Sequence, residues 1–156
     1  MKKILFICHG NICRSPMAEF IFKKMLSENG LSDRVFVSSC ATSTETIWHG
    51  QGEPVYPPAA KELSRHGIFC DGKRSVQLQK SDYNKYDLLI CMDSNNIRNS
   101  MYIIGADPQN KLCKLMDFTD RPGDVSDPWF TRDFVTCYRD IKNGCERLLE
   151  KIKKEL

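Results

Sequence analysis

The sequence predicts an α/β fold in which helices cover both faces of a parallel β-sheet. Residues 4–8, 88–92 and 112–116 form short, largely apolar runs, which are typical of strands buried on both faces. Segments with helical periodicity separate these runs, and such alternation of strands with helices is typical of a parallel sheet. The 156 residues fit a single domain that spans the whole chain, residues 1–156.

The remaining elements follow in chain order. Residues 34–39 are a fourth and shorter strand candidate. After the first strand, the sequence predicts a helix that ends at Gly30. Its apolar side chains recur at helical spacing, at Met17, Phe20, Ile21, Met25 and Leu26. The sequence predicts three further helices, over residues 58–66, 94–104 and 134–152. Gly67 ends the first of them and Gly105 the second.

The charge balance and the cysteines narrow the class of protein. Lys and Arg total 23 against 20 Asp and Glu, a net charge of +3. This excess is too small to indicate binding to nucleic acid or to a membrane. None of the 8 cysteines belongs to a C-x-x-C pair, so the commonest zinc and thioredoxin-like spacings are absent.

The N-terminal residues 1–8 look like the start of a signal peptide, but the apolar run is too short and ends at once in polar residues. No apolar run approaches the length of about 18 residues that a membrane-spanning helix needs. We therefore expect a protein of the reducing cytoplasm. Export by a route that uses no signal peptide stays open. We expect a monomer or a weak dimer.

The segment after the first predicted strand is Cys8-His9-Gly10-Asn11-Ile12-Cys13-Arg14-Ser15-Pro16. In a parallel sheet, ligands bind beyond the carboxyl ends of the strands, where this segment lies. Gly10 and Asn11 tolerate left-handed backbone angles, so the loop can curl with its N–H groups pointing inward. Such a loop, continued by the free N–H groups of a helix start at Pro16, binds anions.

Two side chains of this loop indicate phosphate chemistry. Arg14 offers a planar fork of donors that matches two phosphate oxygens. The electropositive loop is expected to hold Cys8 as a thiolate, to which the Ser15 hydroxyl can donate. A thiolate below a bound phosphate can attack phosphorus, and the loop would hold the oxygens on which charge accumulates. The alternative is that Cys8 is only a buried residue at the end of a strand and that Arg14 only forms a structural salt bridge. That alternative does not explain why Gly10 and Asn11 stand in this loop.

This loop resembles that of the low-molecular-weight protein tyrosine phosphatase family. The resemblance continues along most of the chain, through residues 41–43, 52–59, 66–68, 91–93 and 127–130. It implies a single-domain, four-stranded parallel sheet of the flavodoxin-like or Rossmann-like type. It also implies that the chain acts on phosphotyrosine-containing proteins without a metal or other cofactor.

The chemistry also requires an acid that protonates the leaving phenolate. Of the two Asp-Pro pairs, the one at Asp107 precedes a turn, whereas Asp127-Pro128 precedes Trp129 and Phe130, whose faces can flank a phenyl ring. Asp127 is therefore the candidate acid, and the family places its general acid at this position. After phosphoryl transfer, Asp127 is expected to activate the hydrolytic water.

The remaining site residues are expected to bind substrate or support the loop. The substrate-binding set comprises His9, Gly10, Asn11, Ile12, Cys13, Ser15, Trp48, Trp129 and Phe130. Within the wider family, Thr at the position of Ile12 goes with phosphoarginine phosphatases, whereas Ile goes with phosphotyrosine. Trp129 and Phe130 depart from the Tyr-Tyr pair that is usual in the family.

Other residues are candidates to support the loop or to take part in redox chemistry. The resemblance implies that Asn11, Ser39 and His66 form a buried hydrogen-bond network that holds the loop open. Cys13 either forms a reversible disulfide with Cys8 or is only a small loop residue. No specific role is assigned to Asp93 or His49, nor to His9 beyond its place in the substrate-binding set.

Two other functions compete with this interpretation. A thiol-dependent arsenate reductase needs two further cysteines a few residues apart, yet after Cys91 the next thiol is Cys113. A non-catalytic phosphate-binding module would not need Cys8 and Asp127 together with Arg14.

Overall fold

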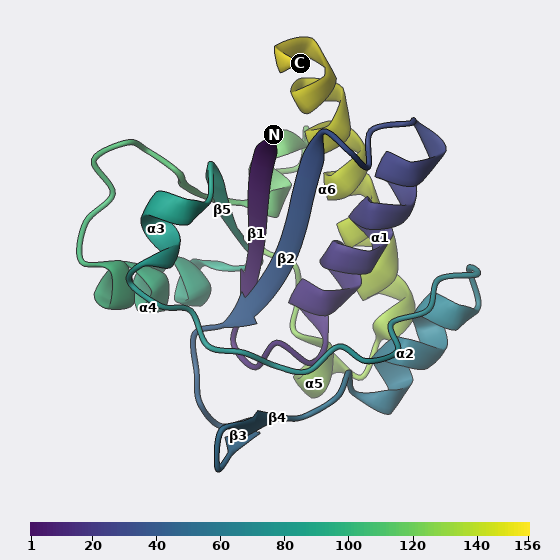
Figure 1. Ribbon diagram of the computed structural model, residues 1–156. Helices are drawn as coiled ribbons and strands as arrows, with labels where there is room; N and C mark the ends of the chain where they lie inside the picture. Colours follow the sequence, from purple (N-terminus) through teal and green to yellow (C-terminus); the bar gives the residue numbers. More distant parts are fainter.

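Four parallel strands form the centre of the molecule in the computed structural model, which describes residues 1–156 (Figure 1). They are β1 (Lys2–Cys8), β2 (Val35–Ala41), β5 (Leu88–Cys91) and β6 (Leu112–Lys114). Their order in the sheet is β2-β1-β5-β6. The chain passes from β1 to β2 on one side and returns to β5 on the other. The carboxyl ends of β1 and β5 therefore form a topological switch point, where ligands bind in this class of fold.

Helices cover both faces of this sheet, as predicted (Figure 1). One face packs against α1 (Arg14–Glu28) and α6 (Phe134–Glu155), with α2 (Pro57–Ser64) beside them. The other face packs against α4 (Ser94–Ile104) and the short α3 (Asp82–Lys85).

Side chains of β1 alternate between the two cores that these layers enclose. Ile4, Phe6 and Cys8 belong to the core below α1 and α6, whereas Leu5 and Ile7 belong to the core below α3 and α4. Cys8 therefore ends β1 on the side from which α1 begins.

Most predicted elements are confirmed, some with shifted ends. The helix at 94–104 has the predicted bounds, and the strand at 34–39 begins one residue later and extends to Ala41. The strand prediction for 112–116 is wrong in its second half, because Leu115–Phe118 forms the 3₁₀ helix η1. Leu115 and Met116 are buried there, and an apolar run does not distinguish a buried strand from a buried helical turn.

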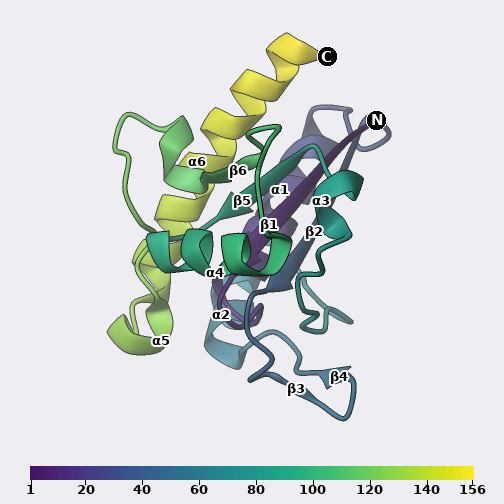
Figure 2. The same ribbon diagram turned by 90° about the vertical axis from the view of Figure 1, so that its left-hand side faces the viewer.

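Short elements beyond the carboxyl ends of the strands have no counterpart in the predictions. They are the hairpin of β3 (Ile47–Trp48) and β4 (Gln51–Gly52), and the four-residue helix α5 (Pro128–Thr131). Figure 2 shows the hairpin and α5 at the same end of the molecule, on either side of the loop that follows β1. They therefore flank the switch point.

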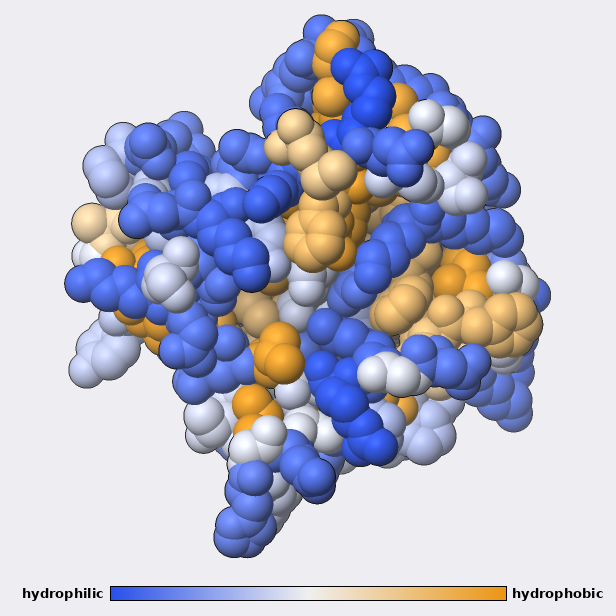
Figure 3. Space-filling view, viewed as in Figure 1, coloured by the Kyte–Doolittle hydropathy of each residue, from blue (hydrophilic) through white to orange (hydrophobic).

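The surface seen in Figure 3 is largely hydrophilic, with apolar side chains in separate small patches. Exposed apolar residues include Phe36, Phe69 and Val76. No helix combines the length with the apolarity that crossing a bilayer would require.

Candidate active site

The loop between β1 and α1 curls over the end of β1, and one residue carries the left-handed turn. Asn11 has a φ of 56°, as the sequence predicted. Gly10 does not adopt a positive φ, so the predicted need for glycine flexibility there is wrong. Its lack of a side chain matters for space instead, because a Cβ on Gly10 would lie 3.3 Å from Cγ2 of Thr46.

Hydrogen-bond donors converge on the sulfur of Cys8. The backbone N–H groups of Asn11 and Ser15 donate to Sγ, at 3.3 Å and 3.4 Å. The Ser15 hydroxyl lies 3.0 Å from the same sulfur. Nδ2 of Asn11 donates to this hydroxyl oxygen at 2.7 Å, so the single Ser15 proton points either toward Cys8 or toward the carbonyl oxygen of Cys40, which lies 3.4 Å away. Such donors stabilise a thiolate more than a thiol.

A buried chain of hydrogen bonds fixes Asn11 from below. Its Nδ2 also donates to the Ser39 hydroxyl at 2.9 Å, and that hydroxyl donates to Oε1 of Glu19 at 2.6 Å. Glu19 is 4% exposed, and its Oε1 lies 3.2 Å from Nζ of Lys73. Oδ1 of Asn11 accepts from the N–H of Val76 at 3.2 Å, so the amide cannot flip without losing bonds on both sides.

His66 lies outside this network, so the role implied by the resemblance is wrong for this chain. Its Nε2 lies 3.0 Å from a carboxylate oxygen of Glu62, and its ring stacks on Tyr138 at 3.8 Å between centroids. Glu19 and Lys73 fill the supporting role. The sole signal for Glu19 in the sequence is an acid within an otherwise apolar helix segment.

Arg14 is 2% exposed and lies between two carboxylates. Its Nη1 donates to Oδ2 of Asp93 at 2.7 Å and to the carbonyl oxygen of Val125 at 2.9 Å. Its Nη2 donates to Oδ2 of Asp127 at 3.4 Å. Nε is buried and has no acceptor within the chain. Burial lowers the pKa of Arg14, but the negative charges of Cys8, Asp93 and Asp127 outweigh burial and raise it, so Arg14 stays a cation.

Asp93 has a double role that the sequence did not assign. Its Oδ1 accepts from the N–H of Asn96 at 2.8 Å and so caps α4. Its other oxygen holds Arg14. A residue at the end of β5 thereby aligns the arginine that follows β1.

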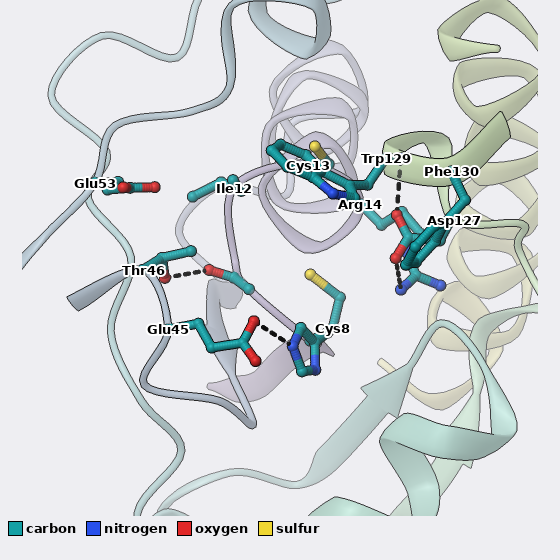
Figure 4. A pocket seen from close by; sticks show the side chains of 12 residues that line it. Cys8, Ile12, Cys13, Arg14, Glu45, Thr46, Glu53, Asp127, Trp129 and Phe130 are labelled. Carbon is teal, nitrogen blue, oxygen red and sulfur yellow. Dashed lines mark hydrogen bonds and ion pairs between the residues drawn. The ribbon is translucent and has the colours of Figure 1, made fainter. Parts of the chain in front are cut away.

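Asp127 caps the short helix α5. Its Oδ1 accepts from the N–H of Trp129 at 3.0 Å, while Oδ2 faces Arg14. The carboxylate thus reaches the site from the segment that follows η1, across from the loop that holds Cys8 (Figure 4).

These groups meet in a cleft of about 450 Å³, a size suited to a small ligand. Figure 4 shows the Cys8 sulfur between Glu45 on one side and Trp129 with Phe130 on the other. The cleft is lined by Cys8, His9, Gly10, Ile12, Cys13, Arg14, Glu45, Thr46, Glu53, Asp127, Trp129 and Phe130. Of the predicted substrate-binding set, Asn11 and Ser15 do not line the cleft, and both residues are buried.

Trp48 does not line the cleft, contrary to its prediction as a substrate-binding residue. It lies on the exposed β3–β4 hairpin, and the residue is 69% exposed. Polar residues that the sequence did not single out, Glu45, Thr46 and Glu53, form that side. His49 lies in the hairpin turn with a φ of 49°, and His9 contacts Glu45 at 3.0 Å.

Cys13 lies in the same cleft, and its thiol is buried. Burial, followed by the negative charge of nearby Cys8, raises the pKa of the Cys13 thiol well above its usual range. Cys13 is therefore a neutral thiol at neutral pH.

Comparisons with known proteins agree with this geometry. The model of the low molecular weight phosphotyrosine protein phosphatase family matches residues 3–156. The chain is 36% identical to the low molecular weight protein-tyrosine-phosphatase YfkJ of Bacillus subtilis, over 99% of this chain and 98% of that protein. It is 35% identical to PtpA of Staphylococcus epidermidis, over 99% and 96% of the two chains.

Solved structures give the same result. The crystal structure of YfkJ superposes with a TM-score of 0.91 at 34% identity, covering 99% of this chain and 96% of that one. A low molecular weight protein tyrosine phosphatase from Streptococcus pyogenes gives a TM-score of 0.85 at 36% identity, with coverage of 97% and 93%. The Drosophila arginine phosphatase DARP gives 0.86 at 26% identity, covering 98% of each chain. The fold therefore does not by itself define the phosphorylated amino acid.

Proposed function

The chain belongs to the low molecular weight phosphotyrosine protein phosphatase family, and we propose that it hydrolyses phosphotyrosine in proteins, and small aryl phosphates, through a phosphorylated Cys8. The observation that carries this proposal is the buried Nε of Arg14, a charged donor without an acceptor, in the loop whose amides surround the Cys8 sulfur. A buried cationic donor left unpaired is costly, and a phosphate oxygen is a natural partner for it.

In the first step, the Cys8 thiolate attacks phosphorus, and the bond between phosphorus and the phenolic oxygen breaks. Asp127, in its protonated form, donates its proton to that oxygen, so tyrosine leaves as a neutral phenol. Arg14 and the loop N–H groups hold the three equatorial oxygens, on which charge accumulates in the transition state.

In the second step, the Asp127 carboxylate removes a proton from water, and the water oxygen attacks the cysteinyl phosphate. The sulfur–phosphorus bond breaks, and inorganic phosphate leaves. This restores the Cys8 thiolate, which Ser15 and the loop amides stabilise, and the acid form of Asp127. The positive charge that the reaction needs comes from Arg14.

The walls of the cleft favour an aryl ester. Ile12, Trp129 and Phe130 supply apolar surface around the Cys8 sulfur. Within the wider family, Ile at the position of Ile12 goes with phosphotyrosine, whereas Thr goes with phosphoarginine. We therefore assign phosphotyrosine-containing proteins as substrates. We place the enzyme in the cytoplasm as a monomer or weak dimer, and its eight free cysteines fit a reducing compartment.

Substitution of the nucleophile tests the proposal. Cys8→Ser is expected to lower turnover of an aryl phosphate by about 10³-fold or more, since the alcohol is a far weaker nucleophile. Binding of inorganic phosphate, measured by calorimetry, should persist because Arg14 and the loop amides remain. Cys70→Ser, at a half-buried free thiol outside the cleft, is the matched control. Turnover by Cys8→Ser at the parental rate would refute the mechanism.

The phosphorylated amino acid needs a separate measurement. A phosphotyrosine peptide and a phosphoarginine peptide of otherwise identical sequence are compared by kcat/KM. We expect a preference of about tenfold or more for phosphotyrosine, which corresponds to about 1.4 kcal/mol of transition-state binding. A preference for phosphoarginine would overturn the substrate assignment and leave the cysteine mechanism intact.

A further inference from the structure

Tyr56 does not line the cleft, yet it contacts both halves of the site. It precedes α2, and its backbone N–H donates to the carbonyl oxygen of Ile12 at 2.8 Å, which ties it to the phosphate-binding loop. Its ring lies 4.9 Å from the ring of Trp129, at an interplanar angle of 54°. The same ring lies 6.1 Å from that of Phe134, at the start of α6.

Arg132 closes this contact from the side of α5. It follows α5 directly and adopts a left-handed backbone with a φ of 59°. Its Nη2 donates to the hydroxyl oxygen of Tyr56 at 3.1 Å, and its guanidinium lies 5.4 Å from the centre of that ring. A left-handed backbone is unfavourable for a residue with a Cβ, and these side-chain contacts favour it at Arg132.

Trp129 links these contacts to the acid. Its ring packs on Tyr56, and its backbone N–H donates to Oδ1 of Asp127. We propose that Tyr56 and Arg132 form a clasp that sets the position of Asp127 for proton transfer. Both are positioning residues, and the inference rests on the proposed function because it assigns them to the proton-transfer step.

Besides the bonds that Arg14 donates to Asp127 and Val125, few contacts hold the acid segment in place. Helix α5 has four residues, and Trp129 and Phe130 are 50% and 80% exposed. On the other side, the N–H of Val125 donates to the carbonyl oxygen of Met92 at 2.8 Å. Proton transfer requires the acid within about 2.6–3.2 Å of the leaving oxygen, so a small displacement of α5 would reduce catalysis.

Tyr56→Leu and Arg132→Gly test the clasp. Glycine keeps the left-handed backbone accessible while it removes the guanidinium. We expect kcat/KM for aryl phosphates with strongly basic leaving groups to fall about 10–100-fold, as for a displaced catalytic group. Esters with weakly basic leaving groups need no acid, so their kcat/KM should change by less than about threefold. The plot of log kcat/KM against leaving-group pKa becomes steeper.

Three further variants make the result decisive. Tyr56→Phe keeps the ring but loses the bond to Arg132, and it should give an intermediate slope. Tyr102→Leu, at a 92% exposed site on α4, is the matched control and should keep the parental slope. Circular dichroism selects the folded variants. Asp127→Asn is the reference, and a parental slope in Asp127→Asn would remove the acid role from the proposed function itself.

The test of the clasp assumes that Asp127→Asn steepens the plot of log kcat/KM against leaving-group pKa. The clasp is then overturned if Tyr56→Leu and Arg132→Gly lower kcat/KM equally for every ester, or do not lower it at all.

Discussion

The chain contains two Asp-Pro pairs, and the structure gives their carboxylates opposite surroundings. The side chain of Asp107 accepts from the hydroxyl of Tyr83 at 2.6 Å and from the N–H groups of Lys111 and Leu112 at 2.7 Å and 3.1 Å. Both of its oxygens are occupied, and the turn that they close leads into β6.

Asp127 accepts one backbone N–H, from Trp129, and turns its second oxygen toward Arg14 and the cleft. A carboxylate surrounded by donors is held as an anion, whereas one with an accessible oxygen can exchange a proton with a ligand. The number and placement of donors, and not the dipeptide, therefore distinguish Asp107, which has a structural role, from Asp127, for which we propose a catalytic one.

The largest expected effect concerns Asp127, the proposed general acid. Asp127→Asn should lower kcat/KM for esters with basic leaving groups by about 10²–10⁴-fold, the usual contribution of a general acid. Asparagine is a good helix cap and its side-chain oxygen can still accept from Trp129, so the melting temperature should stay within about 2 °C of the parent. Steady-state kinetics check the expected loss of activity, and thermal melting checks the unchanged stability. An Asp127→Asn variant as active as the parent would contradict the contrast between the two Asp-Pro pairs.

The structural member should respond in the opposite way. Asp107→Asn removes an anion that binds three donors, and hydrogen bonds to a charged group contribute about 1.5–3 kcal/mol each. We expect a loss of about 1–3 kcal/mol in the free energy of unfolding at pH 7, measured with urea. Activity of the folded enzyme should match the parent, and a loss of activity would assign Asp107 a role in the site.

The pH dependence of stability gives a second test of the structural role of Asp107. Burial raises the pKa of Asp107, but the hydrogen bonds from Tyr83, Lys111 and Leu112 outweigh burial and lower it. The folded-state pKa is therefore below the unfolded value of about 3.9, so this contribution to stability is full above that value and disappears as pH falls through the folded pKa. The stability difference between the parent and Asp107→Asn, measured at pH 7 and pH 3, should shrink on acidification. A constant difference would contradict it.

The smallest expected effect comes from a donor to Asp107. Tyr83→Phe removes the hydroxyl that donates to Asp107 and accepts from the N–H of Gln109. We expect a loss of about 1–2 kcal/mol in the free energy of unfolding, with unchanged kcat/KM. Urea titration beside the Asp107→Asn variant checks it, and an unchanged free energy of unfolding would contradict the expected loss.

The loop between β1 and α1 was predictable because its requirements are local in the sequence. A left-handed turn at Asn11, a fork of donors at Arg14 and a helix start near Pro16 are properties of consecutive residues. The Asp127 assignment followed from its aromatic neighbours, and its carboxylate does line the cleft.

Long-range contacts were not predictable. Glu19 and Lys73 are 54 residues apart in sequence, and neither has a local pattern that indicates its partner. Trp48 was misassigned because periodicity says nothing about where an exposed two-residue strand turns its side chains. The contact between Tyr56 and Trp129 was not predictable because α5 is too short to leave a helical pattern.

The unpartnered Nε of Arg14 has a consequence for the lifetime of the protein. Any oxyanion that accepts this donor binds the folded chain alone, so it shifts the folding equilibrium by mass action. At a concentration 100 times the dissociation constant, this adds about 2.7 kcal/mol to the free energy of unfolding. Inorganic phosphate, the product of the proposed reaction, would then protect the enzyme from unfolding while it competes with the substrate.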